Sequence, residues 1–299
     1  MTTLYKNKKV LCIFLLPAVL LVALLIFLPV ILNVYYSMFK WTAYSKSMEF
    51  VGLKYFQKLF ADEKVWHALL NNAKYAVISI VFQVGLALII AHLLNNFANR
   101  RFASMTRVII FIPAVVSLTA IGLLWVIAYN PSIGFVNPVL EKIGLGAIAH
   151  DWLGDSKTAM WSVIMVSQWQ YIGEMVMLYT VGLQSVPREI YEAASIDGAN
   201  GFQTFFQITI PMIKSTILMN TTITIIGAFM VFDEVYVMTS GGPGNATEVL
   251  ATLMYKTGFR KDNMGYASAI GVLLFVITFI FSFIQMRMYN VKETMKGES

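Results

Sequence analysis

Apolar and polar residues follow one another along this chain in long blocks. Six blocks are almost entirely apolar, and each is about 20 residues or longer, enough for a helix rising 1.5 Å per residue to cross a ~30 Å hydrocarbon layer. We therefore expect an all-α, polytopic membrane protein with a single transmembrane domain over residues 1–299. Its six helices are predicted at approximately 10–39, 73–94, 108–128, 159–183, 215–238 and 266–288.

The first apolar block predicts a retained helix rather than a cleaved leader. It is longer than the 7–15 apolar residues typical of a signal peptide, and it lacks a small-residue cleavage site. Six crossings place both termini on one side. The two sets of loops carry nearly equal numbers of Lys and Arg, but Arg100, Arg101 and Arg107 cluster in a short connection beside the membrane. That cluster favours cytoplasmic termini in a cell-membrane protein.

Composition supports the membrane assignment and removes several classes of function. The 299 residues are 58% hydrophobic and 13% charged, whereas about a quarter of the residues of a soluble protein are charged. The mean hydropathy is +0.69. The net charge of +6 includes no long basic block, so no nucleic-acid partner is expected. Cys12 is the only cysteine, which excludes an intrachain disulfide and makes a cysteine metal site unexpected; we predict no metal site.

Common catalytic motifs are missing from the sequence. There is no G-x-x-x-x-G-K-[ST] segment, and the glycine-rich residues 241–247 have no Lys to reach a phosphate. No histidine stands in H-E-x-x-H, and no G-x-S-x-G elbow is present. We therefore predict that the chain is not an enzyme, has no catalytic residues and does not hydrolyse ATP unaided.

The most polar segment between two predicted spans is residues 184–211. Ser185 is a plausible cap, and Pro187 suits the first turn of a helix. Gly198 interrupts the apolar stripe that follows, and Pro211 closes a second short run. The pattern indicates two short helices joined by a glycine elbow. Small residues on its exposed side would admit another surface, namely Ala193, Ala194 and Gly198.

Residues 192–211 resemble the EAA loop of ABC importer permeases. Glu192-Ala193-Ala194 is followed at the family's spacing by Gly198, Ile208 and Pro211, and Ile210 stands where the pattern has Leu. In that family the loop fits a cleft on the ATPase subunit and carries its motion into the membrane. The resemblance implies that the ATPase-coupling residues are Glu192, Ala193, Ala194, Asp197, Gly198, Ala199, Ile208, Ile210 and Pro211.

Three further segments, residues 50–56, 152–155 and 232–243, are similar to segments in maltose-type, binding-protein-dependent carbohydrate permeases, in the family's order. The long first helix resembles that of one particular member of the permease pair. The resemblance implies a heterodimer with a second permease subunit, two ATPase subunits that hold ATP and Mg, and an extracytoplasmic solute-binding protein. This chain would bind no cofactor and would carry a carbohydrate inward. The connection over residues 129–157 is too short for the large external domain of some members.

Polar residues inside the fourth and fifth predicted spans are candidates for the substrate pathway. An ionisable group at mid-membrane costs about 2.5–3.5 kcal/mol, so Glu174 should face a cavity or a partner. An aromatic ring beside amide and carboxylate groups suits a sugar, although helix–helix hydrogen bonding and packing would explain the same residues. Asp233 and Glu234 could equally lie at a solvated helix end. The predicted pathway residues are Trp169, Gln170, Glu174, Asn220, Phe229, Phe232, Asp233 and Tyr236. The last four of these would share one face of a continuous helix.

The sequence leaves other hypotheses open. An ion-coupled secondary transporter could use Glu174 and Asp233 for coupling, but it would not need the EAA spacing. An importer of a related polar solute, such as glycerol phosphate, would share every feature above. A membrane enzyme is a further class of function, but the sequence contains no recognisable set of catalytic residues for it.

Overall fold

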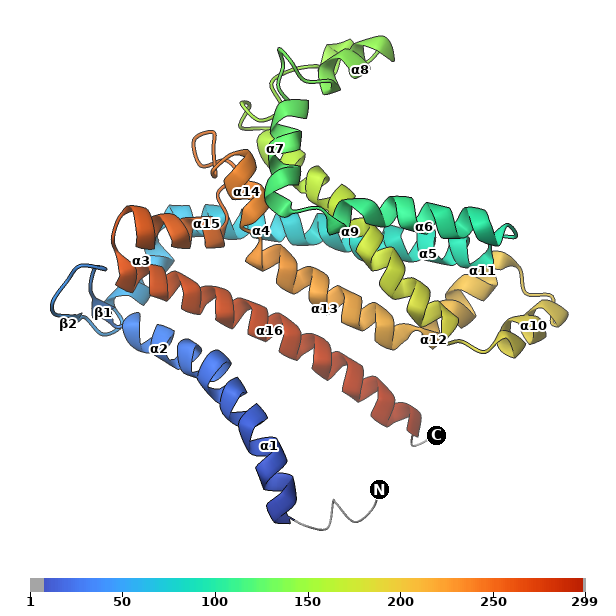
Figure 1. Ribbon diagram of the computed structural model, residues 1–299, viewed down its shortest axis with the longest axis horizontal. Coiled ribbons are helices and arrows are strands. Elements are labelled where there is room, and N and C mark those ends of the chain that lie inside the picture. The colour runs from blue at the N-terminus through green and yellow to red at the C-terminus, as the bar shows by residue number, and fades with distance from the viewer. Residues whose placement is uncertain (1–7, 298–299) are drawn as a thin grey trace. The chain divides into compact units, whose positions relative to one another are not determined.

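A computed structural model describes residues 8–297, with side chains described over residues 14–287, so Cys12 falls outside the described side chains. The described chain is mostly helical and contains one two-stranded sheet (Figure 1). It forms two compact units. The terminal unit comprises residues 8–65 and 253–276, and the central unit comprises residues 66–252 and 277–297.

The terminal unit joins the first and last long helices of the chain. Asn33 Nδ2 donates to the Ser268 carbonyl at 3.3 Å, and the Tyr266 hydroxyl donates to Asp62 Oδ2 at 2.7 Å. A hairpin pairs Phe39 with Phe50 in antiparallel register. The elements are α1 (Lys8–Val22), a π-helical turn (Ala23–Phe27), α2 (Leu28–Tyr36), β1 (Phe39–Lys40), β2 (Glu49–Phe50), α3 (Lys54–Ala61), a π-helical turn (Lys256–Arg260) and the first part of α16 (Met264–Gly297).

The central unit holds the other elements. In chain order they are α4 (Glu63–Ser79), a π-helical turn (Ile80–Leu86), α5 (Ala87–Asn96), α6 (Arg100–Val115), α7 (Leu118–Ala128), α8 (Val136–Lys142), a 3₁₀ turn (Gly146–Ile148), α9 (Ala159–Gln184), α10 (Arg188–Ile196), α11 (Gly201–Gln203), a π-helical turn (Thr204–Thr209), α12 (Ile210–Met212), α13 (Lys214–Met230), α14 (Asp233–Met238) and α15 (Leu250–Tyr255). α4 begins and α15 ends in the terminal unit.

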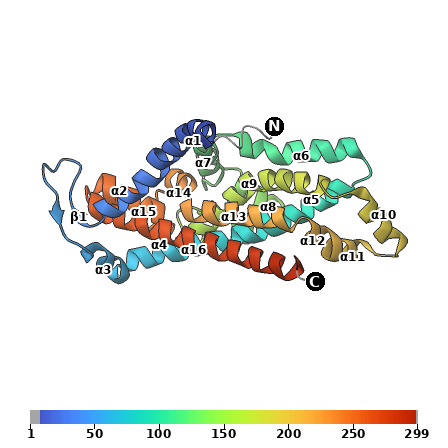
Figure 2. The same ribbon diagram turned by 90° about the horizontal axis from the view of Figure 1, so that it is seen from below.

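Helix α9 is the centre of the central unit. α5 and α6 both run beside it, as the two views agree (Figure 1, Figure 2). The buried core is built mainly from α5 and α9, with Val176, Tyr179 and Leu183 almost fully enclosed. At Gly173 the backbone of α9 approaches α6 so closely that a Cβ would lie 2.1 Å from the Ile110 carbonyl oxygen. Only glycine permits that approach.

The third predicted span is not one straight helix. α6 begins at Arg100, eight residues earlier than predicted, because the Asn99 side chain caps it by accepting from the backbone N–H groups of Arg101 and Phe102. It then ends at Val115, and α7 continues at 95° after an extended Val116 and Ser117. Pro113 lies in the last turn of α6, where its missing N–H removes a hydrogen bond from the helix.

The fifth predicted span is also interrupted, at Val231 and Phe232, between α13 and α14. The prediction of one continuous helix face through residues 229–236 is therefore wrong. Asn72, fully buried on α4, satisfies the carbonyl groups that the break leaves free: its Nδ2 donates to Ala228 at 2.9 Å and to Phe229 at 3.2 Å. Its Oδ1 accepts from the Leu250 N–H at 2.9 Å. One amide thus joins the end of α13 to the start of α15.

The remaining span boundaries differ at their ends. The first helix stops at Tyr36 rather than at residue 39, where the hairpin begins. The second span extends over Glu63–Asn96 and the sixth over Met264–Arg287. Four helices in the described part of the chain are long and apolar enough to cross a membrane, or five with the bent α6–α7 pair. The 26-residue α9 is not among them because polar side chains interrupt it, so the six-span count stays a prediction.

The close contact at Gly173 predicts a specific loss of stability. Gly173→Ala forces α6 away from α9, and overpacking of this kind costs about 1–3 kcal/mol. Gly227→Ala on α13 is the matched control, because its added methyl group would meet nothing within 4 Å. Thermal unfolding of the detergent-purified protein should show a lower midpoint for Gly173→Ala alone. Equal midpoints for the two variants would contradict the α6–α9 contact.

Candidate functional site

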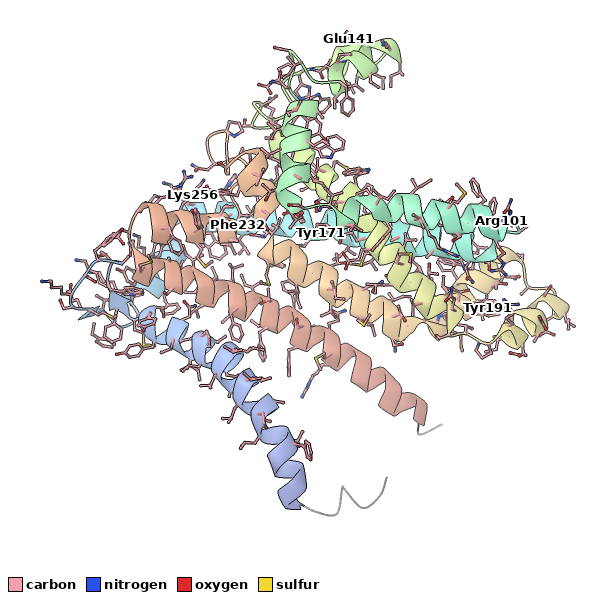
Figure 3. The ribbon with its side chains drawn as sticks, in the orientation of Figure 1. Arg101, Glu141, Tyr171, Tyr191, Phe232 and Lys256 are labelled. Atoms are coloured by element: carbon pink, nitrogen blue, oxygen red, sulfur yellow. The ribbon has the colours of Figure 1, made fainter. Side chains whose placement is uncertain are left out.

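The break between α13 and α14 opens onto a cavity of about 250 Å³ in the central unit. Residues of α4, α9, α13 and α14 line it, with Leu118 at the start of α7. Three predicted pathway residues are among the lining, namely Glu174, Phe232 and Asp233. In Figure 3 the labelled side chains of Tyr171 and Phe232 lie where α7, α9 and α14 meet.

Carboxylates from two helices face this cavity. Glu174 comes from the middle of α9, and Asp233 and Glu234 form the first turn of α14. Glu234 is only 5% exposed and lines the cavity together with Tyr171. The lining contains no Lys or Arg. The interpretation of residues 233–234 as a solvated helix end is therefore wrong for Glu234, which is buried. Asp233 is exposed, as that interpretation requires.

A chain of buried hydrogen bonds fixes the wall between α4 and α9. Gln83 Nε2 donates to Gln168 Oε1 at 2.9 Å, and Gln168 Nε2 donates to Ser79 Oγ at 3.1 Å. Nearby, the Tyr75 hydroxyl donates to Ser167 Oγ. Ser79, Gln83 and Ser167 also line the cavity. Because amides buried in apolar surroundings are costly unless paired, this network holds the two helices in one register.

The other predicted pathway residues do not line this cavity. Trp169 is 45% exposed and lies 5.5 Å, between ring centroids, from Trp125 of α7. Gln170 and Asn220 are buried in the helix packing. Phe229 stacks on Phe281 of α16, with centroids 5.4 Å apart. Tyr236 stacks on Phe232 at 5.0 Å, and so borders the cavity through that ring.

Sequence reasoning missed several lining residues, among them Tyr75, Ser79, Gln83, Tyr171 and Glu234. A usable signal existed for Gln83, an amide in the middle of an apolar block and therefore in need of a buried partner. Tyr171 and Glu234 carry no comparable signal, because the break in the fifth span is what brings both residues into the lining of one cavity.

The segment 184–211 folds as two short helical stretches about an elbow, as predicted. Gly198 has φ +79°, a left-handed conformation that favours glycine, and it ends α10. Asn200 then starts the second stretch with a capping box, exchanging 2.9 Å hydrogen bonds with Gln203. Ser185 does not cap α10. Its hydroxyl donates to the Gly182 carbonyl at 2.7 Å and so ends α9.

One side of this segment is anchored and the other is open. Tyr191 and Phe205 pack on the buried core of the central unit, and Ala194, predicted to be exposed, is 7% exposed. Glu192, Ala193, Asp197 and Gly198 are exposed, as is Pro211. Ala199, Ile208 and Ile210 are half-buried. Two large apolar side chains point outward, with Ile196 86% and Phe202 73% exposed, an arrangement typical of a docking surface.

Comparison with known proteins gives a consistent result. Residues 83–289 match a family model described as "Binding-protein-dependent transport system inner membrane component". The probable ABC transporter permease protein YurN of Bacillus subtilis is 46% identical over 285 residues, covering 95% of this chain and 97% of that protein. The lactose transport system permease protein LacF of Rhizobium radiobacter is 32% identical, covering 91% of each chain.

Two further similarities extend the comparison. The trehalose/maltose transport system permease protein MalF of Thermococcus litoralis is 29% identical, covering 95% of this chain and 94% of that protein. Among solved structures, a chain of a bacterial ABC transporter involved in the import of the acidic polysaccharide alginate matches with a TM-score of 0.80 at 23% identity. That match covers 95% of this chain and 96% of that one, and it shows the fold.

The broken fifth span predicts a contrast in thiol labelling. In a Cys12→Ser background, Asp233→Cys should react with water-soluble methanethiosulfonates in detergent-purified protein, whereas Phe229→Cys, at a position 4% exposed, should not. A cationic reagent should react roughly tenfold faster than an anionic one at Asp233→Cys, because neighbouring carboxylates concentrate cations.

A continuous helix would give a different pattern, because it would place residues 229 and 233 on one face. Equal labelling at the two positions would contradict the break at Val231 and Phe232.

Proposed function

This chain belongs to the family of inner-membrane permease components of binding-protein-dependent transport systems, and on that premise we propose that it carries a carbohydrate into the cytoplasm as part of an ATP-driven importer. The observation that carries the proposal is the cavity at the α13–α14 break, where three carboxylates line a hollow inside an apolar bundle. Relatives named for trehalose/maltose and lactose transport support the choice of substrate class.

The chemistry of the cavity suits a ligand rich in hydroxyl groups. Glu174 and Asp233 supply hydrogen-bond acceptors, and the hydroxyls of Tyr171 and Ser79 act as donors or acceptors. The ring of Phe232, stacked on Tyr236, offers an apolar surface beside them. Sugars combine hydroxyl edges with flat apolar faces, so both kinds of contact are used. The roles of Trp169, Gln170, Asn220 and Phe229 are then to pack and support the walls.

Charge narrows the substrate further, toward neutral sugars. Glu174, Asp233 and Glu234 line the cavity without any Lys or Arg in the lining. An anionic ligand would face like charges there, where the low dielectric strengthens repulsion relative to water. The same argument disfavours glycerol phosphate, the alternative solute considered from the sequence. We therefore assign a neutral carbohydrate to this cavity.

The segment 184–211 is the proposed docking site for the ATPase. Its exposed Ile196 and Phe202 provide apolar area, and the elbow at Gly198 leaves open space around its backbone. On this proposal the coupling residues are the EAA-type set predicted from the sequence, with Glu192 and Ala193 on the open side. ATP and Mg are held by the ATPase, whose closure moves the segment.

The proposed assembly follows from the separation of the substrate cavity, in this chain, from ATP binding, in the ATPase. A second permease subunit forms a heterodimer with this chain, two ATPase subunits dock on the cytoplasmic side, and a solute-binding protein delivers the sugar from outside. A solved transporter matching at a TM-score of 0.81 is described as a complex with an alginate pentasaccharide-bound periplasmic protein. Six crossings, counting α6–α7 as the third and α9 as the fourth, place both termini in the cytoplasm.

The rival hypothesis of an ion-coupled secondary transporter draws on the same residues, because Glu174 and Asp233 line one cavity. Family membership argues against it, since members of this family work with a binding protein. The two hypotheses differ in energy source, which uptake measurements separate.

Removing one carboxylate tests the substrate cavity. Glu174→Gln should lower sugar uptake about tenfold, since a hydrogen bond to a charged group contributes about 1.5–3 kcal/mol. The measurement is uptake of radiolabelled neutral oligosaccharide by proteoliposomes that contain the whole complex. Glu141→Gln, at an exposed position on α8, is the control and should transport normally. Unchanged uptake by Glu174→Gln would remove this residue from the pathway.

Two substitutions in the segment 184–211 test the docking site. Glu192→Lys and Gly198→Pro should abolish ATP-driven uptake and lower ATPase copurification at least tenfold, while membrane insertion stays intact. Pro cannot adopt the positive φ of Gly198. Glu189→Lys, one turn earlier on the same helix and also exposed, is the matched control. Uptake by Glu192→Lys that survives ATP depletion and collapses with the ion gradient would favour the secondary transporter.

A further inference from the structure

A second, larger cavity of about 420 Å³ lies in the central unit beneath α10. It forms where α5 ends, α6 begins and α9 ends, so three apolar helices reach the same boundary there. Its lining differs sharply from that of the carboxylate-lined cavity. Three arginines from two elements face it, Arg100 and Arg107 of α6 and Arg188 of α10, together with Asn95 and Asn96 of α5.

The arginines of this cavity carry uncompensated charge. Glu192 is the single acidic residue in the lining, so two net positive charges remain. In the part of the chain that the structure describes, neither Glu192 nor any of the three guanidinium groups forms an ion pair within 4.0 Å. Like charges gathered around a hollow repel one another, and an anion in the hollow would relieve that repulsion.

Arg107 is held in place for such a ligand. One guanidinium nitrogen, Nη2, donates to the Leu94 carbonyl at 3.0 Å, which fixes the side chain at the end of α5. Its Nε is buried and has no hydrogen-bond partner among the described residues. A buried donor without a partner costs about 1–3 kcal/mol. Guanidinium groups match phosphate oxygens in geometry, and the fixed orientation lowers the entropy cost of binding.

The position of the cavity indicates the source of the anion. It opens at the ends of α5 and α9, where apolar helices give way to polar connections, which is the depth of lipid headgroups. Basic pockets between helices at the cytoplasmic boundary are a recurring way to hold anionic headgroups. Leu183 and Val186 add apolar surface to the same lining.

We propose that this cavity binds a phosphate group, supplied by the headgroup of an anionic phospholipid. The bound phosphate lies against Arg100, Arg107 and Arg188 and so joins the start of α6 to the start of α10. It braces the segment that the proposed function assigns to ATPase docking. The binding itself does not depend on that function, which adds only the consequence for coupling.

The test uses the whole complex in lipid nanodiscs made of phosphatidylcholine with a minor fraction of phosphatidylglycerol. Native mass spectrometry measures how much phosphatidylglycerol each variant retains. Arg107→Gln and Arg188→Gln should each lower retention about tenfold, because each removes a charge-assisted contact. Arg101→Gln is the matched control, an exposed neighbour on α6 outside the lining, and should retain lipid as the parent protein does.

A second arm separates the two sources of phosphate. In nanodiscs of phosphatidylcholine alone, the unfolding midpoint is measured in inorganic phosphate against chloride at equal ionic strength. Stabilisation by inorganic phosphate that Arg188→Gln abolishes, without selective lipid retention, would identify free phosphate as the ligand of the same site.

Two results would overturn the proposal. In one, Arg107→Gln and Arg188→Gln retain phosphatidylglycerol like the parent protein and inorganic phosphate has no effect. In the other, Arg101→Gln loses as much lipid as the cavity variants, which would show general surface charge. Neither result bears on sugar uptake, so this site and the proposed function fail separately.

Discussion

The central unit depends on how an interrupted helix satisfies its backbone inside an apolar bundle. Every carbonyl freed in such surroundings needs an internal partner, because no water is present to replace the lost hydrogen bond. At the end of α13 that partner is Asn72, whose single side chain accepts from the start of α15 and donates to two carbonyls of the last turn. This contact allows α13 to end and α14 to begin as a separate helix, which brings Asp233 and Glu234 to the cavity.

The cavity and the segment 184–211 are connected through the same two helices. α9 contributes Glu174 to the cavity and leads directly into the segment, and α13 leaves the segment and ends at the break. The amide network between Gln83 and Gln168 ties α9 to the second span, and the contact at Gly173 ties it to α6. A displacement of α10 would therefore move several cavity walls together, as packed helices move as rigid bodies.

Much of the fold could be predicted because long apolar blocks and turn residues act locally. The glycine elbow at Gly198 is of this kind, since its left-handed backbone is a property of that one position. The interruptions could not be predicted in the same way. The break falls at Val231 and Phe232, so neither Pro nor Gly marks it in the sequence. It is stabilised by Asn72, which lies 156 residues away in sequence from Ala228. Asn72 itself lies one residue before the second predicted span, which begins at residue 73. The lining residues that depend on this contact, Tyr171 and Glu234, were missed for the same reason.

The most direct test is the labelling rate of Asp233→Cys in the assembled complex, in a Cys12→Ser background, with and without ATP trapped on the ATPase subunits. If docking at residues 184–211 drives the cavity walls, the rate from outside should rise when ATP is trapped. The rise should be absent when Glu192→Lys is added. A rate that is the same in both nucleotide states, in a complex that still transports sugar, would contradict the coupling of this cavity to ATP.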